Sequence, residues 1–200
     1  MARYTGPKDR LSRSVGFDLF GKGSKLTRLN VPPGMHGGRR MRRSTSEFAK
    51  QLKEKQKVKM LYGILERQFS RYAQRALKYK GDTGVQLLSL LEKRLDNVLF
   101  RLGVAPSRTS ARQFISHGHV LVNQKKVNIP SYQVKKGDLI AMSSKGVNIP
   151  SVAKLLSNKN FKTPSWLERK GMVGRIVRNP IREDITEPIV EQDIVEYYSR

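Results

Sequence analysis

The side chains with the most suggestive spacing in this sequence are the basic ones that follow Ser107. Arg108 and Arg112 lie four residues apart in a segment of helical periodicity, so both should project from one face of a helix, away from its apolar residues. Lys125 and Lys126 lie at the tip of an expected hairpin just beyond it. Guanidinium and ammonium groups grouped in this way bind phosphate oxygens. The chemistry predicted for this stretch is recognition of a nucleic-acid backbone.

Three other clusters have the same basic character. Four arginines fall within positions 39–43, shortly after the turn and chain-breaking signal Pro32-Pro33-Gly34. Lysines recur at i, i+3 and i+7 from Lys50, and arginines recur every fourth residue from Arg67 to Arg75. Such rows are often only solvated helix faces, but like charges in register repel, and phosphates opposite them would remove that penalty. The candidate RNA-binding residues are Arg39, Arg40, Arg42, Arg43, Lys50, Lys53, Lys57, Arg67, Arg71, Arg108, Arg112, His117, Lys125 and Lys126.

The composition indicates a polyanionic partner for the chain as a whole. Its 200 residues include 40 Lys and Arg against 16 Asp and Glu, a formal net charge of +24. Self-repulsion on this scale destabilises a free monomer, so a bound polyanion is expected to neutralise it. The bases run along most of the chain, which favours nucleic acid over an anionic membrane or an acidic protein. Residues 183–200 are the exception, with six carboxylates and one arginine.

Catalytic, metal and membrane signals are weak by comparison. Without cysteine the chain has no disulfide and no thiolate metal site. His117 and His119 could pair on a metal, but no further ligand is near in sequence, and a histidine at a helix end is the simpler interpretation. No nucleophile elbow or nucleotide phosphate loop is present. We expect a soluble, cytoplasmic protein without a metal or cofactor, because no signal-peptide or membrane-helix pattern is visible.

Apolar periodicity predicts five helices that would position these side chains. The first is expected to begin at a Ser44 N-cap, to place Phe48 on its apolar face and to be interrupted at Gly63. The second should turn Leu65 and Phe69 toward a core. The expected ranges are 44–62, 64–80, 85–102, 107–115 and 190–198.

After residue 118 the apolar period changes from 3.6 to 2. Strands are therefore expected at 119–122, 126–129 and 139–142, forming a small antiparallel sheet. Residues 1–43 lack sustained periodicity and should form an extended basic arm that RNA orders. The predicted fold class is α+β.

Several motifs in order along the chain resemble one known family. The runs RLDNVLFRLG at 94–103 and SRTSARQFISHGHVLVN at 107–123 resemble the S4 RNA-binding domain. The flanking runs match as well: MARYTGP at 1–7, PPGMHG at 32–37, EKQK at 54–57 and EYYSR at 196–200. Together they are similar to the bacterial type of the S4 family of small-subunit ribosomal proteins over essentially the whole chain.

The resemblance implies an arrangement of domains and a place in the ribosome. It implies a basic arm at 1–43 and a helical domain at 44–91 completed by 178–200. Between these would lie an S4 domain at 92–155 and a connecting segment at 156–177. It further implies early assembly on a multi-helix junction in the 5′ domain of small-subunit ribosomal RNA. A place near the messenger RNA entry beside the S5 protein, where the family influences translational accuracy, is implied too.

The sequence departs from the family pattern in two places. Many members hold zinc or an iron–sulfur cluster with four N-terminal cysteines, and here Asp9 and Ser12 occupy the first pair of positions. The hairpin often contains Asn-Gly where this chain has Asn123 and Gln124. Since glycine suits the positive φ of a type I′ turn, a different turn is expected.

Two alternative functions remain open from the sequence alone. Arg94-Leu95-Asp96 is similar to the catalytic motif of pseudouridine synthases, in which Asp96 would be the catalytic residue. Against this, Asp96 falls in a leucine-patterned helix, where pairing of Arg94 or Arg101 with Asp96 or Glu92 is the better account. A nonspecific DNA-compacting protein is the other alternative. If Arg108 and Arg112 face away from the core, replacing both by Ala should weaken RNA binding and leave the fold intact.

Overall fold

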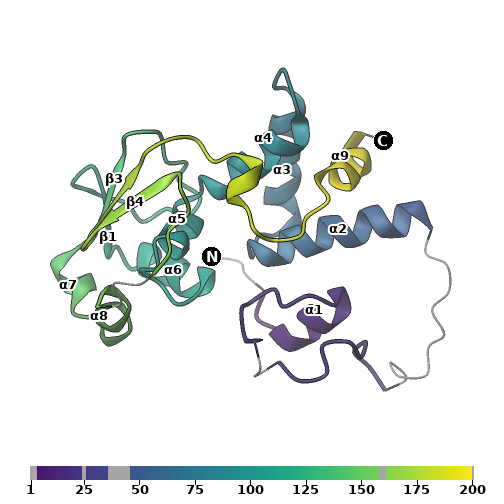
Figure 1. Ribbon diagram of the computed structural model, residues 1–200, viewed down its shortest axis with the longest axis horizontal. Helices are drawn as coiled ribbons and strands as arrows, with labels where there is room; N and C mark the ends of the chain where they lie inside the picture. The colour runs from purple at the N-terminus through teal and green to yellow at the C-terminus, as the bar shows by residue number, and fades with distance from the viewer. Residues whose placement is uncertain (1–3, 24–25, 36–45, 158–160, 200) are drawn as a thin grey trace. The chain divides into compact units, whose positions relative to one another are not determined.

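The chain leaves one group of helices, forms a second unit, and then returns to the first. The computed structural model describes residues 4–23, 26–35, 46–157 and 161–199. Residues 1–84 and 188–200 belong to the first unit, here called the helical unit, and 85–187 form the second, the sheet unit (Figure 1). The predicted α+β class is confirmed, because helices are combined with one small antiparallel sheet. The sequence had drawn the corresponding boundaries at residues 91 and 178.

Packing of the C-terminal helix against α2 and α3 builds the helical unit. Within the described residues its helices are α1 (Lys8–Val15), α2 (Glu47–Leu61), α3 (Glu66–Leu77) and α9 (Glu191–Ser199). The expected end of α2 is confirmed at Gly63, whose φ is +63°. The apolar interior of the unit includes Val58, Leu61, Phe69, Tyr72, Ala76 and Ile194.

The buried face of α2 differs from the predicted one. Phe48 is 49% exposed, whereas Gln51, Lys55 and Val58 are buried. Two of these are polar residues that contact α9: the Gln51 amide donates to Glu196 at 2.7 Å, and the Lys55 ammonium lies 4.4 Å from the centre of the Tyr197 ring. Apolar periodicity missed this face because its partners on α9 are polar or aromatic and far away in sequence.

The start of α2 and the start of α3 also needed correction. The N-cap of α2 is Ser46, whose hydroxyl accepts a hydrogen bond from the Ala49 N–H at 3.3 Å, and Ser44 lies outside the described residues. Leu65 is the N-cap of α3 and is 39% exposed, so it does not face the core as expected. Its non-helical backbone turns the side chain out of the helical register.

The N-terminal arm contains a helix that the sequence analysis did not predict. Helix α1 ends at Gly16, which has a φ of +76° and donates its N–H to the Ser12 carbonyl at 2.8 Å. The buried Ser12 hydroxyl accepts from the Leu19 N–H at 3.4 Å, and the Arg13 guanidinium donates to the Val31 carbonyl at 2.9 Å. Hydrogen bonds between side chains and main chain hold this segment, and an apolar period cannot reveal them.

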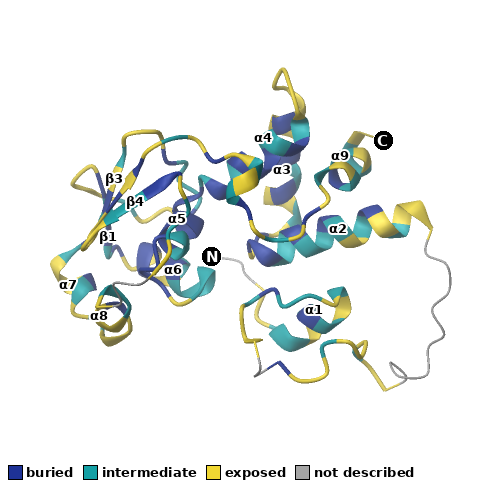
Figure 2. Ribbon diagram, viewed as in Figure 1, coloured by how far each residue is buried: buried dark blue, intermediate teal, exposed yellow. Residues whose placement is uncertain are grey.

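The sheet unit packs helices against one face of a five-stranded antiparallel sheet. Its helices are α4 (Thr83–Glu92), α5 (Leu95–Arg101), α6 (Arg108–Ser116), α7 (Ser144–Val147) and α8 (Pro150–Leu156). A 3₁₀ turn at Arg182–Asp184 comes after the last strand. The strands are β1 (Val120–Val122), β2 (Lys125–Lys126), β3 (Leu139–Met142), β4 (Leu167–Lys170) and β5 (Val173–Ile176), in the order β2-β1-β3-β5-β4. Figure 2 shows the buried residues concentrated on α5 and the covered face of the sheet; they include Leu95, Leu99, Ile115, Val120, Ile140, Trp166 and Ile176.

The segment at 156–177, expected only to connect domains, supplies two of these strands. Strand β5 pairs with β3 and β4, with Ile140 opposite Gly174, and Trp166 just before β4 is fully buried. Gly174 is required at this point because a Cβ there would collide with the Leu102 side chain. The strands were missed because β4 contains one apolar residue, Leu167, and Gly174 interrupts β5, so neither shows an apolar period.

The leucine-rich stretch expected as one helix at 85–102 is two helices. Lys93 and Arg94 separate α4 from α5, and Arg94 has an extended backbone. Main-chain hydrogen bonds to the 130–134 segment replace the helical ones here, including Leu95 N–H to the Tyr132 carbonyl at 2.9 Å and Val134 N–H to the Lys93 carbonyl at 3.0 Å. Tertiary pairing has overridden a strong helical pattern.

The β1–β2 hairpin has the turn that the sequence argued against. Asn123 and Gln124 have φ values of +49° and +66°, and Val122 pairs with Lys125, as in a two-residue type I′ turn. Asn123 is held in this conformation by its own side chain, which accepts from the Leu139 N–H and donates to Asp138, both at 2.9 Å. Asparagine tolerates this backbone region without glycine when such local bonds are made.

Candidate RNA-binding surface

Arg112 does not project freely from α6 as the sequence predicted. Its guanidinium donates to the Asp96 carboxylate at 2.7 and 3.1 Å, and its side chain is 13% exposed. Arg94 donates to the same carboxylate at 2.7 and 3.1 Å, and the side chains of Arg94 and Asp96 are each only 2% exposed. The expected pairing of Arg94 with Asp96 is confirmed, and two arginines enclose this carboxylate.

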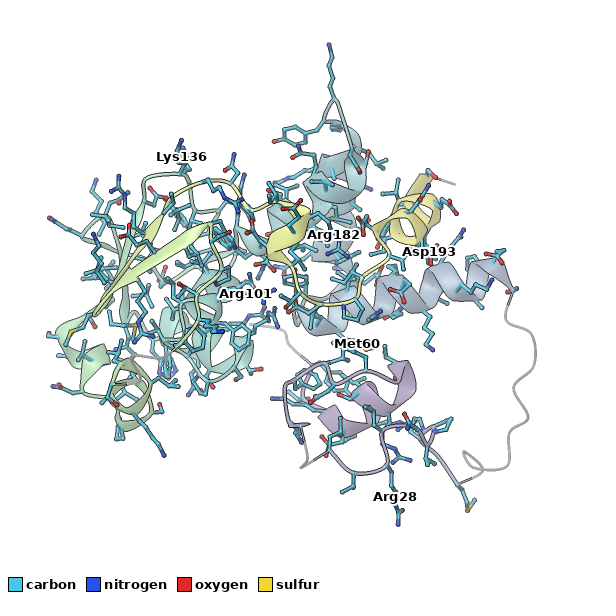
Figure 3. All side chains as sticks on the ribbon, viewed as in Figure 1. Arg28, Met60, Arg101, Lys136, Arg182 and Asp193 are labelled. Atoms are coloured by element: carbon cyan, nitrogen blue, oxygen red, sulfur yellow. The ribbon has the colours of Figure 1, made fainter. Side chains whose placement is uncertain are left out.

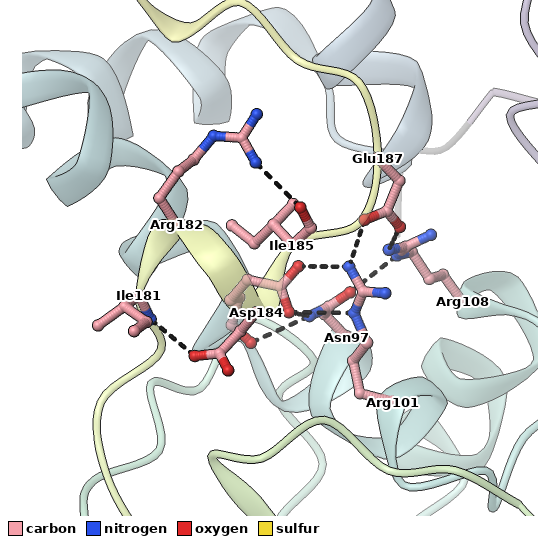
Figure 4. A network of polar contacts seen from close by, with 9 residues as sticks. Asn97, Arg101, Arg108, Ile181, Arg182, Asp184, Ile185 and Glu187 are labelled. Atoms are coloured by element: carbon pink, nitrogen blue, oxygen red, sulfur yellow. Dashed lines mark hydrogen bonds and ion pairs between the residues drawn. The ribbon is translucent and has the colours of Figure 1, made fainter.

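Arg108 belongs to a closed ring of five side chains, which we name the junction network: Glu92, Asn97, Arg101, Arg108 and Glu187. Around the ring, Arg101 donates to Glu92 at 2.8 Å and to Glu187 at 2.8 Å. Arg108 donates to Glu187 at 3.4 Å and to the Asn97 amide oxygen at 2.8 Å. The Asn97 amide donates back to Glu92 at 2.7 Å, which closes the ring (Figure 4).

The electrostatics of this network favour its charged form. Burial alone lowers the pKa of Arg101, but the adjacent carboxylates of Glu92 and Glu187 outweigh burial and raise it above its usual value. Burial likewise raises the pKa of Glu187, and the guanidinium groups of Arg101 and Arg108 lower it below its usual range. The expectation that Arg108 and Arg112 face away from the core is wrong, because carboxylates hold both guanidinium groups.

On α3 the predicted row of arginines is presented to solvent. Arg67, Arg71 and Arg75, here called the arginine row, are all exposed, while Phe69, Tyr72 and Ala76 on the other side of the helix are buried. None of the three forms an ion pair with any carboxylate that the structure describes. These guanidinium groups are available to an external anion.

The three lysines predicted on α2 fall into three different settings. Lys53 is exposed and has no ion pair within the described residues. Lys50 pairs with Glu47 at 2.6 Å on an exposed face. Lys57 is 12% exposed, pairs with Glu54 at 3.2 Å, and lies 5.9 Å from the centre of the Phe17 ring. Only Lys53 remains fully available for an outside partner.

At the hairpin tip, Lys125 and Lys126 are exposed, as expected, and His117 is the exposed C-cap of α6. The Lys126 side chain lies directly over Gly118, where no Cβ would fit, so the tip and the end of α6 form one surface. Lys136 is also exposed and projects outward from the same unit (Figure 3). The predicted arm residues Arg39, Arg40, Arg42 and Arg43 lie outside the described residues.

Sequence reasoning missed most of the polar residues that organise the molecule. Pairing of Arg101 with Glu92 was predicted, but Asn97 was not, and Glu187 is 86 residues from Arg101. In the helical unit, Glu66 accepts from Lys55 and Lys59, each at 2.9 Å, and from the Tyr198 hydroxyl at 2.8 Å. Burial raises the pKa of Glu66, but hydrogen bonds from the two lysines and the tyrosine lower it to about 2.

Other kinds of site find little support in the described residues. The His117 and His119 rings lie 6.1 Å apart, yet no group of three acidic or histidine side chains in the described ranges could hold a metal ion. Likewise, none of the helices that the structure describes is long and apolar enough to cross a bilayer.

Comparison with known proteins gives matches over the whole chain. Residues 3–92 match the family model described as the ribosomal protein S4/S9 N-terminal domain, and residues 93–140 match that of the S4 domain. Among similar proteins, the small ribosomal subunit protein uS4 of Parabacteroides distasonis is 48% identical over 202 aligned residues. The proteins of the same name from Porphyromonas gingivalis and Cytophaga hutchinsonii are 47% and 48% identical. In all three cases the alignment covers 100% of both chains.

Proposed function

Because this chain belongs to the uS4 family of small ribosomal subunit proteins, we propose that it nucleates assembly by clamping a junction of ribosomal RNA helices. The family binds ribosomal RNA in the small subunit, so the open question is which side chains do so here. The observation that carries the proposal is the arginine row, three exposed guanidinium groups in register with no carboxylate opposite them among the described residues. Lys53 is a further exposed base of the helical unit, and His117, Lys125 and Lys126 are exposed on the sheet unit.

Recognition would depend on backbone and shape more than on individual bases. The exposed candidates are guanidinium, ammonium and imidazole groups, which suit phosphate oxygens. The candidate arginines at 39–43 would join them from the arm. The net charge of +24 supports the same conclusion, since bound phosphates would relieve the self-repulsion of the chain.

The more detailed part of the proposed role is based on the resemblance to the family. The proposal includes early binding to the 5′ domain of the ribosomal RNA and a place in the ribosome of a bacterial cytoplasm. It also includes a contribution to accuracy near the messenger RNA entry, beside the S5 protein. The acidic helix α9, with Glu191 and Asp193 in its first turn, supports a protein neighbour on that side because its charge is the reverse of the RNA-facing rows.

A structural role fits better than an enzymatic one. The aspartate that an RNA-modifying enzyme would use, Asp96, is 2% exposed, and both of its oxygens accept hydrogen bonds from Arg94, Arg112 and the Asn97 N–H. A carboxylate enclosed in this way has no face left for a substrate. The relatives are named as ribosomal proteins, which supports the same view.

The test is to identify the RNA that the protein selects. Tagged protein expressed in a bacterium should be purified with its bound RNA and the RNA sequenced after crosslinking. We expect crosslinks concentrated in the 5′ domain of small-subunit ribosomal RNA. In vitro, a folded 5′-domain fragment should outcompete duplex DNA of equal phosphate content. Equal competition by duplex DNA would instead support nonspecific compaction, and a large pool of the protein free of ribosomal particles in cells would contradict the proposal.

A further inference from the structure

The Glu187 carboxylate occupies a position between two converging guanidinium groups. Arg101, from the end of α5, donates to one of its oxygens at 2.8 Å, and Arg108, from the start of α6, donates to the other at 3.4 Å (Figure 4). The Arg101 and Arg108 side chains are each 11% exposed and that of Glu187 is 14% exposed. The carboxylate thus bridges two largely buried arginines of the sheet unit.

Glu187 can leave this position while both guanidinium groups keep hydrogen-bond partners. Arg101 would keep its two hydrogen bonds to Glu92, at 2.8 and 3.2 Å. Arg108 would keep its bond to the Asn97 amide oxygen at 2.8 Å and its stacking over the Phe100 ring, 4.6 Å from the ring centre. Asp96 differs, since its two arginines hold it by four bonds and its side chain is only 2% exposed.

The place of Glu187 in the chain also favours its release. It is the last residue of the sheet unit and is followed by the exposed Pro188. Glu187 lies between two buried apolar residues, Ile185 two positions earlier and Ile189 two positions later, so only Glu187 and its immediate neighbours can move while both isoleucines stay packed. Its longest contact in the network, 3.4 Å to Arg108, is at the outer limit for a charged hydrogen bond.

The guanidinium groups of Arg101 and Arg108 can bind a phosphate at least as well as a carboxylate. Two guanidinium groups that point at one pair of oxygens form the arrangement that arginines use for carboxylates and for phosphates. We infer that Arg101 and Arg108 form a phosphate-binding site that Glu187 fills in the free protein and that a backbone phosphate of the bound RNA takes over. This inference rests on the proposed RNA-binding function. It gives Arg108 the role that its sequence context predicted, although the free protein has it ion-paired.

A comparison of two charge-matched variants of the full chain tests the exchange. Glu187→Gln removes the competing charge but keeps an amide oxygen for the arginines, so the fold should hold. Glu183→Gln changes the net charge equally at an exposed residue that has no ion pair among the described residues. Dissociation constants for a 5′-domain ribosomal RNA fragment should be measured for both variants and the parent at equal salt. We expect Glu187→Gln to bind at least three times more tightly than Glu183→Gln.

Each possible result has a definite meaning. Equal affinities, or weaker binding by Glu187→Gln with its fold intact by circular dichroism, would overturn the exchange while leaving RNA binding in place. Loss of the gain when Arg108→Gln is added to Glu187→Gln would support the exchange, and persistence of the full gain would refute it. If the parent protein bound the fragment no better than duplex DNA, both the proposed function and this inference would fall.

Discussion

Two regions of the molecule carry arginines at the same helical spacing and use them in opposite ways. Arg67, Arg71 and Arg75 on α3 are exposed and unpaired within the described chain, whereas Arg108 and Arg112 on α6 are largely buried and bonded to carboxylates. Neither helix places an acidic residue three or four positions from these arginines. The two helices therefore offer their arginines no carboxylate from their own sequence. The α6 arginines are paired because the fold brings Asp96 and Glu187 to them.

Asp96→Asn should have the largest effect, because it removes the one carboxylate shared by two buried arginines. An amide keeps the shape but leaves the Arg94 guanidinium, 2% exposed, without its counter-charge. Breaking a buried pair in this way costs about 3 to 5 kcal/mol of unfolding free energy. Urea unfolding followed by fluorescence of Trp166, the single and fully buried tryptophan of the chain, would measure it in the sheet unit. The exposed variant Glu183→Gln should leave the unfolding free energy unchanged. If both variants lost a similar amount of unfolding free energy, the buried pairing of Asp96 would not be the cause.

A matched pair of arginine deletions sharpens the comparison directly. Arg112→Ala leaves Asp96 with one guanidinium in place of two and should lower the unfolding free energy by about 1.5 to 3 kcal/mol, the range for a buried charged hydrogen bond. Arg75→Ala, on an exposed face of α3, should change it by less than about 0.5 kcal/mol. Both can be followed by circular dichroism during urea unfolding. If both deletions lowered the unfolding free energy equally, the difference in exposure between the α3 and α6 arginines would not account for their roles.

Glu66 gives an intermediate case, because it lies on α3 and is nevertheless paired. Its folded pKa of about 2 lies below the usual 4.5, so its contribution to stability is complete above pH 4.5 and is lost as the pH falls toward 2. Its side chain is 44% exposed, and after allowance for solvent screening we expect about 1 to 2 kcal/mol. The difference in melting temperature between the parent protein and Glu66→Gln should shrink across that interval. The control is Glu183→Gln, which removes no ion pair among the described residues, and a constant Glu66→Gln difference down to pH 2 would contradict the pairing.

The sequence was a good guide to elements and a poor one to charged partners. Helix α6 and strand β3 followed from a helical period and from the change of the apolar period to 2, which are local properties. The break at Arg94 and the burial of Lys55 did not, because each depends on a segment more than 35 residues away, at 130–134 or on α9. The arginine row was visible from spacing alone, since nothing distant pairs with it. Spacing shows that side chains share a face, and only the fold shows whether that face is already neutralised.

Replacing all three residues of the arginine row by Gln should have the smallest effect on stability and a clear effect on RNA binding. The change in unfolding free energy should stay within about 0.5 kcal/mol and can be slightly stabilising, because three repelling charges are removed from one face. If each guanidinium neutralises one phosphate, the slope of log K against log salt should decrease in magnitude by about 2 to 3. A control triple of exposed lysines in the sheet unit, Lys135, Lys136 and Lys154 changed to Gln, alters the net charge equally. If the slope fell equally in both triples, the arginine row would act only through the net charge of the protein. The difference between the row and the α6 arginines would then affect folding and not RNA binding.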